Sequence, residues 1–290
     1  MARYVTEQEV AAALSPADAV AAVEACCQRM ARGEVELLPR ARVGGLAVMA
    51  AADRELGLRG SKTYAAGAFV VSLFDGDGLV AVIEADRLGQ LRTGAASAVA
   101  ARQLARAGAR SLGIIGCGWQ AEGHVAAMRT ALPALEEVVA YCRSEERLDE
   151  FCAKMDAEAG ESHRDAAEQD IVVTATTSRD PVLRGEWLRP GTLVCAIGAN
   201  DGRSRELDNT VVERAAFVCC DSLAQARRES ADLIEPVEQG VLDWLEVHEL
   251  HEVVAGDLQG RGSDDDVVLF KSNGIAAWDV AAAAAVLAKR

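Results

Sequence analysis

The sequence predicts an α/β protein that combines a doubly wound parallel sheet domain with a second domain of α+β type. From Ser111 onward, apolar runs typical of strands alternate with helical stretches, which is the pattern of a parallel sheet with helices on both faces. A glycine-rich turn, GCGWQA, directly follows the first of these runs. Since 290 residues suffice for two modest cores, a separate domain is expected before that turn.

The composition is that of a folded globular protein, with half of the residues hydrophobic and 26% charged. A net charge of -15 without any basic patch disfavours nucleic acid and anionic membrane surfaces as partners. The first 32 residues lack the pattern of a signal peptide, and no apolar segment approaches membrane-spanning length. We therefore expect a cytoplasmic protein with neither a nucleic-acid nor a membrane partner.

The cysteines and histidines do not predict a metal site. The eight cysteines lie mostly in apolar runs and form no CxxC pair, so buried reduced thiols are expected. His248 and His251 stand three residues apart, a spacing that two metal ligands can use, but no further ligands accompany them. An ordinary helix face is the favoured interpretation.

The first hundred residues predict two helices and a small sheet. Residues 15–32 have Ser15 as a candidate N-cap and Pro16 at the first helical position, followed by apolar residues at helical spacing. Short apolar runs between residues 43 and 84 predict strands, with the DGDG segment as a hairpin turn. Residues 86–108 are alanine-rich and lack proline, which predicts a long helix that Gly108 ends.

The second part of the chain predicts the elements of the parallel sheet in order. Strands are expected at SLGIIG, EVVAYC, DIVVTATT, TLVCAIGAN, AAFVCCD and VVLFK, with helices near residues 119–132 and 144–159. The chain closes with an alanine-rich helix after the SNG turn.

The turn GCGWQA has the form G-x-G-x-x-A of the Rossmann dinucleotide fingerprint. Gly116 permits the tight turn, Gly118 lets the backbone approach a pyrophosphate, and Ala121 keeps the helix close to the strand. Trp119 and Gln120 lie within the turn and are expected beside the cofactor, although Trp119 suits the sheet edge equally well. Glycine turns also have purely structural uses, but the preceding strand and following helix favour nucleotide binding here.

The end of the second strand bears on the choice of cofactor. NAD sites usually place an acidic residue there, whereas this chain has Tyr141-Cys142-Arg143-Ser144. Arg143 and Ser144 suit a 2′-phosphate, because arginine offers two charge-assisted hydrogen bonds. NADP(H) is therefore preferred and NAD(H) is possible; if Arg143 is an ordinary surface residue, the choice stays open.

Three cations lie among small or apolar residues before the glycine turn: Arg40 in LLPRARV, Lys62 in GSKTYAAG and Arg92 in LRTGAAS. Each alone is more often a surface or structural residue than a ligand group. Together, in an acidic protein, they are candidates to converge on a substrate carboxylate.

Several motifs carry a more specific resemblance. Lys62-Thr63, LRTGAASAVAA, IIGCGWQAEGH, AIGANDGRSRELD and FKSNGIAAWDVAAA follow one another in this order and span nearly the whole chain. In this the sequence resembles the ornithine cyclodeaminase and mu-crystallin family, and in particular its ketimine reductase-like members.

The resemblance implies a domain organisation and a substrate class. Residues 1–109, completed by residues 274–290, are expected to form a substrate-binding and dimerisation domain, so both chain ends build it. Residues 110–273 are expected to form the NAD(P)-binding Rossmann domain. The family pattern further implies a homodimer and NAD(P)-dependent chemistry at the α-carbon of an amino or imino acid.

The same pattern assigns residues to the site. Arg40, Lys62 and Arg92 match the positions that bind the substrate carboxylate, with Arg42 as an alternative to Arg40 because the register there is uncertain. Thr93 and Ser272 are further candidates for cofactor contact, although Ser272 also fits simple turn chemistry. Asp279 matches a family position, for which helix capping or dimer packing explains an aspartate equally well.

Asn200 departs from the family pattern. Deaminating members carry an aspartate where this chain, counted back from Glu206-Leu207-Asp208, has Asn200. An amide cannot exchange a proton as a carboxylate can, which disfavours acid and base work at a substrate amine. Asp201 is adjacent, and a local shift is the alternative that would bring it to this position.

The sequence therefore predicts an NAD(P)H-dependent reductase of cyclic imino acids. Δ1-Pyrroline-2-carboxylate or Δ1-piperideine-2-carboxylate would yield proline or pipecolate, with Lys62 and Asn200 as the candidate catalytic positions and Lys62 influencing imine protonation. The alternatives are ornithine cyclodeaminase and an amino-acid dehydrogenase or reductive aminase of 2-oxo acids. The non-enzymatic alternative is a mu-crystallin-like protein that binds NADP(H).

Overall fold

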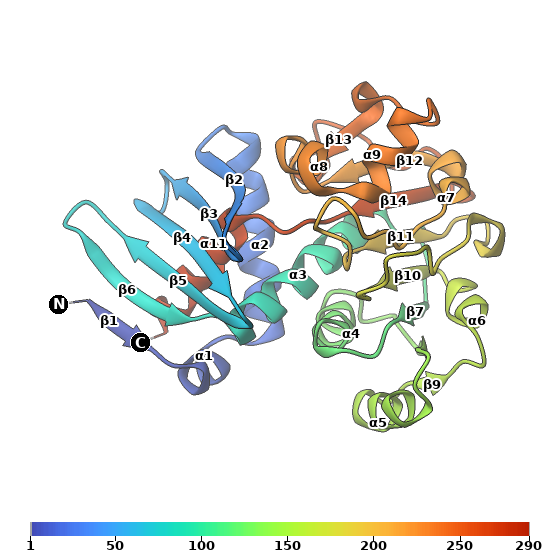
Figure 1. Ribbon diagram of the computed structural model, residues 1–290, viewed down its shortest axis with the longest axis horizontal. Coiled ribbons are helices and arrows are strands. Elements are labelled where there is room, and N and C mark those ends of the chain that lie inside the picture. The colour runs from blue at the N-terminus through green and yellow to red at the C-terminus, as the bar shows by residue number, and fades with distance from the viewer. Residues whose placement is uncertain (1, 290) are drawn as a thin grey trace. The chain divides into compact units, whose positions relative to one another are not determined.

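In the computed structural model, which describes residues 2–289, the chain forms two compact units (Figure 1). Unit 1 comprises Met1–Ala96 with Gly274–Arg290, and unit 2 comprises Ser97–Asn273. The first division falls within helix α3 (Asp86–Leu104), before the boundary expected after residue 109. Because the helix continues through that point, the sequence shows no proline, glycine cluster or composition change that could mark it.

Unit 1 is built on a six-stranded sheet with the strand order β1-β6-β5-β4-β3-β2. Strands β2 to β6 form an antiparallel meander, and β1 pairs in parallel with β6. The strands are β1 (Arg3–Val5), β2 (Val35–Val43), β3 (Leu46–Asp53), β4 (Leu58–Ala65), β5 (Ala68–Phe74) and β6 (Leu79–Glu84). Strand β2 escaped prediction because VELLPRARV contains a proline and lacks a regular apolar alternation.

Three further helices belong to unit 1: α1 (Glu7–Ala13), α2 (Pro16–Ala31) and α11 (Ala276–Ala288). The helix predicted over residues 15–32 is confirmed, with Ser15 and Asp18 forming a capping box at the start of α2. Helix α11 packs against α2 and against strands β2 to β5. Its return to unit 1 brings residues near the C-terminus beside the N-terminal sheet.

Unit 2 is a doubly wound parallel sheet, as predicted, with the strand order β13-β12-β14-β11-β10-β7-β8-β9. The chain adds β8 and β9 on one side of β7 and then returns to the other side with β10, β11 and β14. The strands are β7 (Ser111–Ile115), β8 (Glu137–Tyr141), β9 (Glu158–Ala159), β10 (Ile171–Thr174), β11 (Leu193–Ala196), β12 (Ala215–Cys220), β13 (Val247–Glu249) and β14 (Val267–Lys271). In such sheets ligands bind at the carboxyl ends of the strands where the order reverses, here between β7 and β10.

Short helices connect the strands of unit 2. The glycine turn leads into α4 (Trp119–Ala131), and β8 leads into α5 (Glu145–Met155), close to the ranges predicted for both. The others are α6 (His163–Ala167), α7 (Asn209–Arg214), α8 (Leu223–Glu229), α9 (Ala231–Glu238), α10 (Leu250–Val254) and two 3-10 turns, Gly185–Trp187 and Trp244–Glu246.

The remaining sequence features find ordinary places in the fold. All eight cysteines are free thiols, and five of them are buried. The helix face expected for both histidines is wrong for His248, which lies on strand β13 with its ring stacked on that of Phe217 at a centroid distance of 5.1 Å. His251 lies on α10, 3.4 Å from the Glu249 carboxylate. Within residues 2–289, no single helix has the length and apolar composition of a membrane span, and α1 and α2 meet that test only as a pair bent by 83°.

Candidate functional site

The glycine turn after β7 has the geometry that a dinucleotide cradle requires. Gly116 has a φ of +108°, and a Cβ there would lie 2.5 Å from the carbonyl oxygen of Ala175, so only glycine fits. Gly118 is the N-cap of α4, and its side faces open space with no atom within 4 Å of a Cβ. Ala121 is fully buried behind it. With no side-chain cap at Gly118, an anion can approach the start of α4.

A cavity of about 470 Å³ opens beside this turn, at the carboxyl ends of β7, β8 and β10. Its size and position suit part of a nucleotide. Of the described residues, Trp119 and Gln120 do not line it; Trp119 is 44% exposed at the first position of α4. The lining includes Gly116, Cys117, Gly118, Tyr141, Cys142, Arg143, Ser144, Arg147, His163, Thr176, Thr177, Ser178 and Asp180.

One wall of the cavity is basic and lies where β8 ends. Ser144 caps α5, with its hydroxyl accepting a hydrogen bond of 3.4 Å from the backbone N–H of Arg147. Arg143 and Arg147 are exposed on the cavity wall, and neither forms an ion pair with any residue in the described range. In a chain with a net charge of -15, two cations without a carboxylate partner mark this wall as a candidate anion site.

The predicted cations of unit 1 meet around a buried carboxylate. Lys62 on β4 donates from Nζ to Oδ1 of Asp279 on α11 at 2.9 Å, and Arg92 on α3 donates from Nε to the same oxygen at 3.0 Å. Lys62 is 4% exposed, Arg92 is 5% exposed and Asp279 is fully buried. The structure thus pairs the two cations with Asp279, for which the sequence had suggested helix capping or dimer packing.

Arg40 joins the same cluster through a bulge in β2. The register between β2 and β3 shifts between Leu38 and Ala41, and the Arg40 side chain is buried. Its Nη2 donates to the backbone oxygen of Gly274 at 3.1 Å. Arg42 is exposed, so the geometry favours Arg40 over its alternative.

Two glycines leave room for the cations. A Cβ at Gly89 would lie 2.8 Å from Nζ of Lys62. Gly274 has a φ of +77°, and a Cβ there would lie 2.7 Å from Nη1 of Arg92. The turn before α11 is therefore shaped around the guanidinium group of Arg92.

Burial and neighbouring charges set the protonation of the cluster. Burial lowers the pKa of Lys62 to about 8; Asp279 opposes this shift, while Arg92 and Arg40 add to it. Burial alone would raise the pKa of Asp279, but Arg92 and Lys62 together hold it below its usual value, so the carboxylate stays ionised. Lys62 can consequently gain or lose a proton near neutral pH, as a group that exchanges protons with a substrate must.

The cluster also has polar atoms without partners. Nη1 of Arg92 and Oδ2 of Asp279 are buried, and neither has a hydrogen-bond partner in the described part of the chain. Such groups are costly to bury unsatisfied and are concentrated where ligands bind. Around Asp279 the protein therefore offers a free cationic donor and a free anionic acceptor.

Asp279 is the site residue whose role the sequence analysis missed. It lies 217 positions from Lys62, and no spacing rule connects the two. The available signal was a single charged residue in the first turn of an otherwise apolar helix, AAWDVAAAAAVLA. A buried helix carries such a charge only when a partner satisfies it.

Asn200 lies in the loop after β11, in unit 2. The backbone oxygen of the preceding residue, Ala199, accepts a hydrogen bond of 2.6 Å from Nζ of the buried Lys271. Asp201 accepts hydrogen bonds from the backbone N–H groups of Arg203 and Ser204 at 2.9 and 2.8 Å. In this structure the Asp201 carboxylate thus belongs to a local turn, and the catalytic role of Asn200 stays a prediction.

The buried residue Glu206 holds the base of this loop. Its carboxylate accepts hydrogen bonds from the Thr174 hydroxyl at 2.9 Å and from the backbone N–H groups of Thr176 and Gly198, both at 2.6 Å. Burial raises the pKa of Glu206, while Lys271 opposes the rise. This carboxylate therefore links the carboxyl ends of β10 and β11.

Thr93 and Ser272 have hydrogen bonds within the protein. The Thr93 hydroxyl donates to the backbone oxygen of Gly89 at 2.6 Å, and the Ser272 hydroxyl donates to Oδ2 of Asp221 at 3.0 Å. Their contacts with a cofactor stay predictions.

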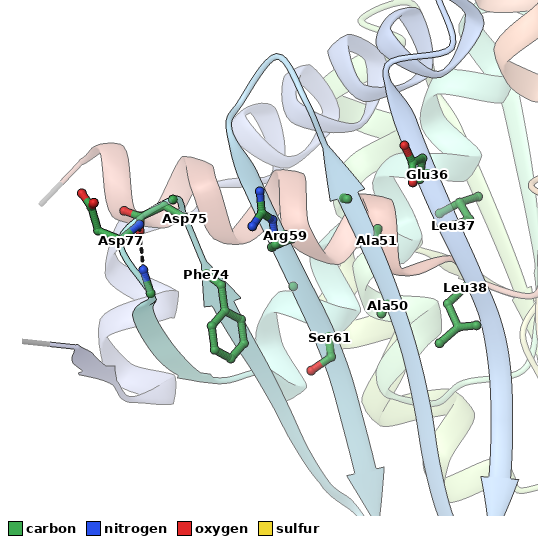
Figure 2. A pocket seen from close by; sticks show the side chains of 14 residues that line it. Glu36, Leu37, Leu38, Ala50, Ala51, Arg59, Ser61, Phe74, Asp75 and Asp77 are labelled. Carbon is green, nitrogen blue, oxygen red and sulfur yellow. Dashed lines mark hydrogen bonds between the residues drawn. The ribbon is translucent and has the colours of Figure 1, made fainter.

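A larger hollow of about 820 Å³ lies over the other face of the unit 1 sheet and does not contain the cations (Figure 2). Leu38, Ala50, Arg59, Ser61 and Phe74 are among the residues that line it. Successive strand residues point to opposite faces, so Ser61 faces this hollow while Lys62 faces α11. The larger hollow thus lies on one face of the unit 1 sheet, and the buried cations lie on the other face, against α11. We place the candidate site at the cations because of their chemistry.

Comparison with known proteins decides the family. A sequence model of the ornithine cyclodeaminase/mu-crystallin family matches residues 2–289. The chain belongs to this family. The resemblance inferred from LRTGAAS, the glycine turn and FKSNGIAAWD is confirmed over essentially the whole length.

Individual members of the family share about a third of the sequence. The chain is 37% identical to alanine dehydrogenase from Archaeoglobus fulgidus over 71% of this chain and 65% of that protein. It is 34% identical to a Δ1-pyrroline-2-carboxylate reductase from Bacillus cereus over 69% of this chain. The aligned stretch spans 64% of that reductase, so both matches cover just under two thirds of the relative's length.

Among solved structures, the Δ1-pyrroline-2-carboxylate reductase of Thermococcus litoralis, in complex with NADH and L-proline, superimposes with a TM-score of 0.91. The match covers 99% of this chain and 96% of that one at 27% sequence identity. The two-unit architecture is therefore that of the family.

Proposed function

We propose that this family member is an NAD(P)H-dependent oxidoreductase that reduces the C=N bond of cyclic imino acids. The substrates would be Δ1-pyrroline-2-carboxylate or Δ1-piperideine-2-carboxylate, and the products proline or pipecolate. The observation that carries the proposal is the buried pairing of Lys62 and Arg92 with Asp279, with the buried Arg40 close enough to act on the charge of Lys62. Relatives named as Δ1-pyrroline-2-carboxylate reductases support the same substrate class.

The cluster suits the carboxylate of such a substrate. Three buried cations and one ionised carboxylate make up the cluster, so it keeps a net positive charge and favours an anionic ligand. Nη1 of Arg92 is buried and has no hydrogen-bond partner in the described part of the chain, so it is a donor that a carboxylate could satisfy. Anchoring of the carboxylate fixes the orientation of the ring and of its C=N bond, which is how positioning lowers a barrier.

Lys62 would supply the proton that accompanies reduction. Reduction of C=N to CH–NH adds one hydride at carbon and one proton at nitrogen. With a pKa of about 8, the Lys62 ammonium is largely protonated at neutral pH and can release its proton without a large penalty. This role does not require a carboxylate at position 200, which matches the presence of Asn200.

The glycine turn would hold the dinucleotide. A nicotinamide cofactor, when bound, supplies the hydride. Gly116 and Gly118 fit a pyrophosphate, because the turn is open at Gly118 and no side chain caps the start of α4. Arg143 and Ser144 on the cavity wall support NADP(H) as the preferred cofactor, with NAD(H) possible.

The proposal is tested by oxidation of NADPH and NADH against a panel of substrates. The panel contains both cyclic imino acids, pyruvate with ammonia or methylamine, and ornithine. We expect the highest kcat/KM with a cyclic imino acid. Preference for pyruvate with an amine would instead support an amino-acid dehydrogenase or reductive aminase, in line with the alanine dehydrogenase relative.

Two other outcomes would overturn the proposal. Redox-neutral conversion of ornithine to proline, without net consumption of NADPH, would identify an ornithine cyclodeaminase. Tight NADPH binding without turnover on any member of the panel would favour a non-catalytic, mu-crystallin-like binding protein.

We also propose a homodimer joined through the open face of the unit 1 sheet. The residues that line the large hollow include Leu38, 57% exposed, and Phe74, 40% exposed, together with charged residues such as Glu36 and Arg59 (Figure 2). Leu38→Asp and Phe74→Asp are expected to produce a monomer in sedimentation equilibrium, because each buries a charge in the interface. A wild-type chain that is monomeric at micromolar concentration would contradict this assembly.

A further inference from the structure

We propose that His163 is a proton-coupled contact for the 2′-phosphate of NADP(H), so that binding of the phosphorylated cofactor takes up a proton at this imidazole. The inference rests on the proposed cofactor preference and extends it with a further residue and a pH dependence. Its experiment is chosen so that the two can fail separately.

His163 shares the cavity with the predicted phosphate contacts. It is the first residue of α6, and it lines the same space as Arg143, Ser144 and Arg147. Its ring packs against Tyr141, the last residue of β8, with centroids 4.6 Å apart and an angle of 68° between the planes. The aromatic contact fixes the imidazole on the wall where a 2′-phosphate would be bound by Arg143.

The imidazole is available to a ligand. His163 is half-buried, and its ring nitrogens have no hydrogen-bond partner in the part of the chain that the structure describes. Together with Arg143 and Arg147, it gives the wall three groups that can carry positive charge, and none of them is ion-paired within residues 2–289.

The carboxylates nearby do not neutralise this wall. On α6 itself, Asp165 accepts hydrogen bonds from the backbone N–H groups of Glu161 and Ser162, at 2.8 and 2.9 Å. Arg164 pairs with Glu168 on the exposed side. Among the remaining charged groups, Asp180 lines the cavity, and Glu145 and Glu146 are exposed in the first turn of α5.

The direction of the pH effect follows from the charges. Burial and the charge of Arg143 lower the pKa of His163, so the free imidazole is neutral at pH 7. A phosphate dianion within reach favours the protonated ring and raises this pKa. Because the bound state then holds more protons than the free state, affinity for the 2′-phosphate increases as pH falls through the pKa of the bound form.

The test uses two cofactor fragments that differ only in the 2′-phosphate, namely 2′,5′-ADP and 5′-AMP. Binding to the full chain is measured by isothermal titration calorimetry between pH 6 and pH 8, in buffers of different ionisation enthalpy, which counts protons taken up. We expect the Kd for 2′,5′-ADP to fall about three- to tenfold from pH 8 to pH 6, with uptake of up to about one proton. The Kd for 5′-AMP should not fall over the same range.

The variant His163→Gln keeps a hydrogen-bonding side chain but cannot take up the proton, and it should flatten the pH dependence for 2′,5′-ADP. His248→Gln is the matched control, since His248 stacks on Phe217 and does not line the cavity. Ionisation of the phosphate itself occurs in both proteins and strengthens binding as pH rises, so the difference between wild type and variant isolates the imidazole.

The outcomes separate the two proposals. If 2′,5′-ADP binds no more tightly than 5′-AMP at any pH, the preference for NADP(H) is wrong. If 2′,5′-ADP binds more tightly but His163→Gln retains the wild-type proton uptake and pH dependence, the role of His163 is wrong and the cofactor preference stands.

Discussion

The two basic regions of the molecule differ in whether their cations are paired with a carboxylate. In unit 1, Lys62 and Arg92 are buried and share one oxygen of Asp279. In unit 2, Arg143 and Arg147 are exposed on a cavity wall and have no ion-pair partner among the described residues. The first region carries its own counter-ion, and the second leaves that position to a ligand.

The difference follows from the cost of burial. Buried cations without a carboxylate destabilise the folded state, so Asp279 stabilises unit 1 when no substrate is bound. Exposed arginines remain hydrated and cost little without a partner. The cluster around Asp279 is therefore preorganised and has an adjustable proton affinity, whereas the exposed arginines of the cavity wall remain available to an anionic group.

The largest effect is expected from removal of the buried lysine. Lys62→Ala should lower kcat/KM for the best cyclic imino acid by about 10³-fold, because it removes a proton donor and a carboxylate contact together. The Kd for NADPH, measured by fluorescence titration, should stay within about twofold, since the glycine turn and the cavity wall belong to unit 2.

The matched control is Lys154→Ala, which removes an exposed lysine paired with Glu122. Its kcat/KM should remain at the wild-type value. Normal turnover in Lys62→Ala would mean that the cluster is a structural ion network and that the substrate binds elsewhere.

A smaller effect with a distinct signature is expected from Asp279→Asn. In the wild type, kcat/KM should fall as pH rises above about 8, because the Lys62 ammonium that donates the proton is lost there. Asp279 favours the charged lysine, so its removal lowers the Lys62 pKa and moves this limb of the profile to lower pH. Activity at pH 8 should decrease about 10- to 100-fold, with a smaller loss at pH 6.

Asp279→Glu keeps the charge and should retain the position of the alkaline limb even if kcat is reduced. Thermal unfolding and NADPH binding of both variants show whether the fold is intact. An unchanged pH profile in a folded Asp279→Asn protein would show that Asp279 does not act on the lysine that donates the proton.

The sequence predicts the cavity region better than the cluster, and the reason is chain distance. Gly116, Gly118 and Arg143 lie within a single strand-helix-strand segment, where the order of residues already fixes their spatial relation. The cluster depends on β4, α3 and α11, which meet only in the folded protein. Family resemblance supplied its cations, but its counter-ion Asp279 had no local pattern that could reveal its partner.

Backbone detail was also beyond the sequence. Arg40 is buried at a bulge that shifts the register of β2 by one residue. Strand β2 was not predicted because its sequence, VELLPRARV, contains Pro39. The division of the chain within α3 is invisible in an alanine-rich helix that continues through it. These features depend on tertiary packing, which overrides local preference.

The smallest effects should separate the two glycines of the cavity. Gly118→Ala places a methyl group in open space with φ at -105°, so its cost to stability should stay below about 1 kcal/mol. That methyl lies where the backbone must approach the pyrophosphate, so the Kd values for NADPH and NADH should both rise about tenfold, or about 1.4 kcal/mol. Gly116→Ala instead combines a positive φ with a Cβ 2.5 Å from the Ala175 oxygen, and should lower the free energy of unfolding by about 2–3 kcal/mol in urea titrations. Wild-type cofactor affinity in a folded Gly118→Ala protein would place the pyrophosphate away from this turn, and the basic wall beside it would then lose its assignment to the 2′-phosphate.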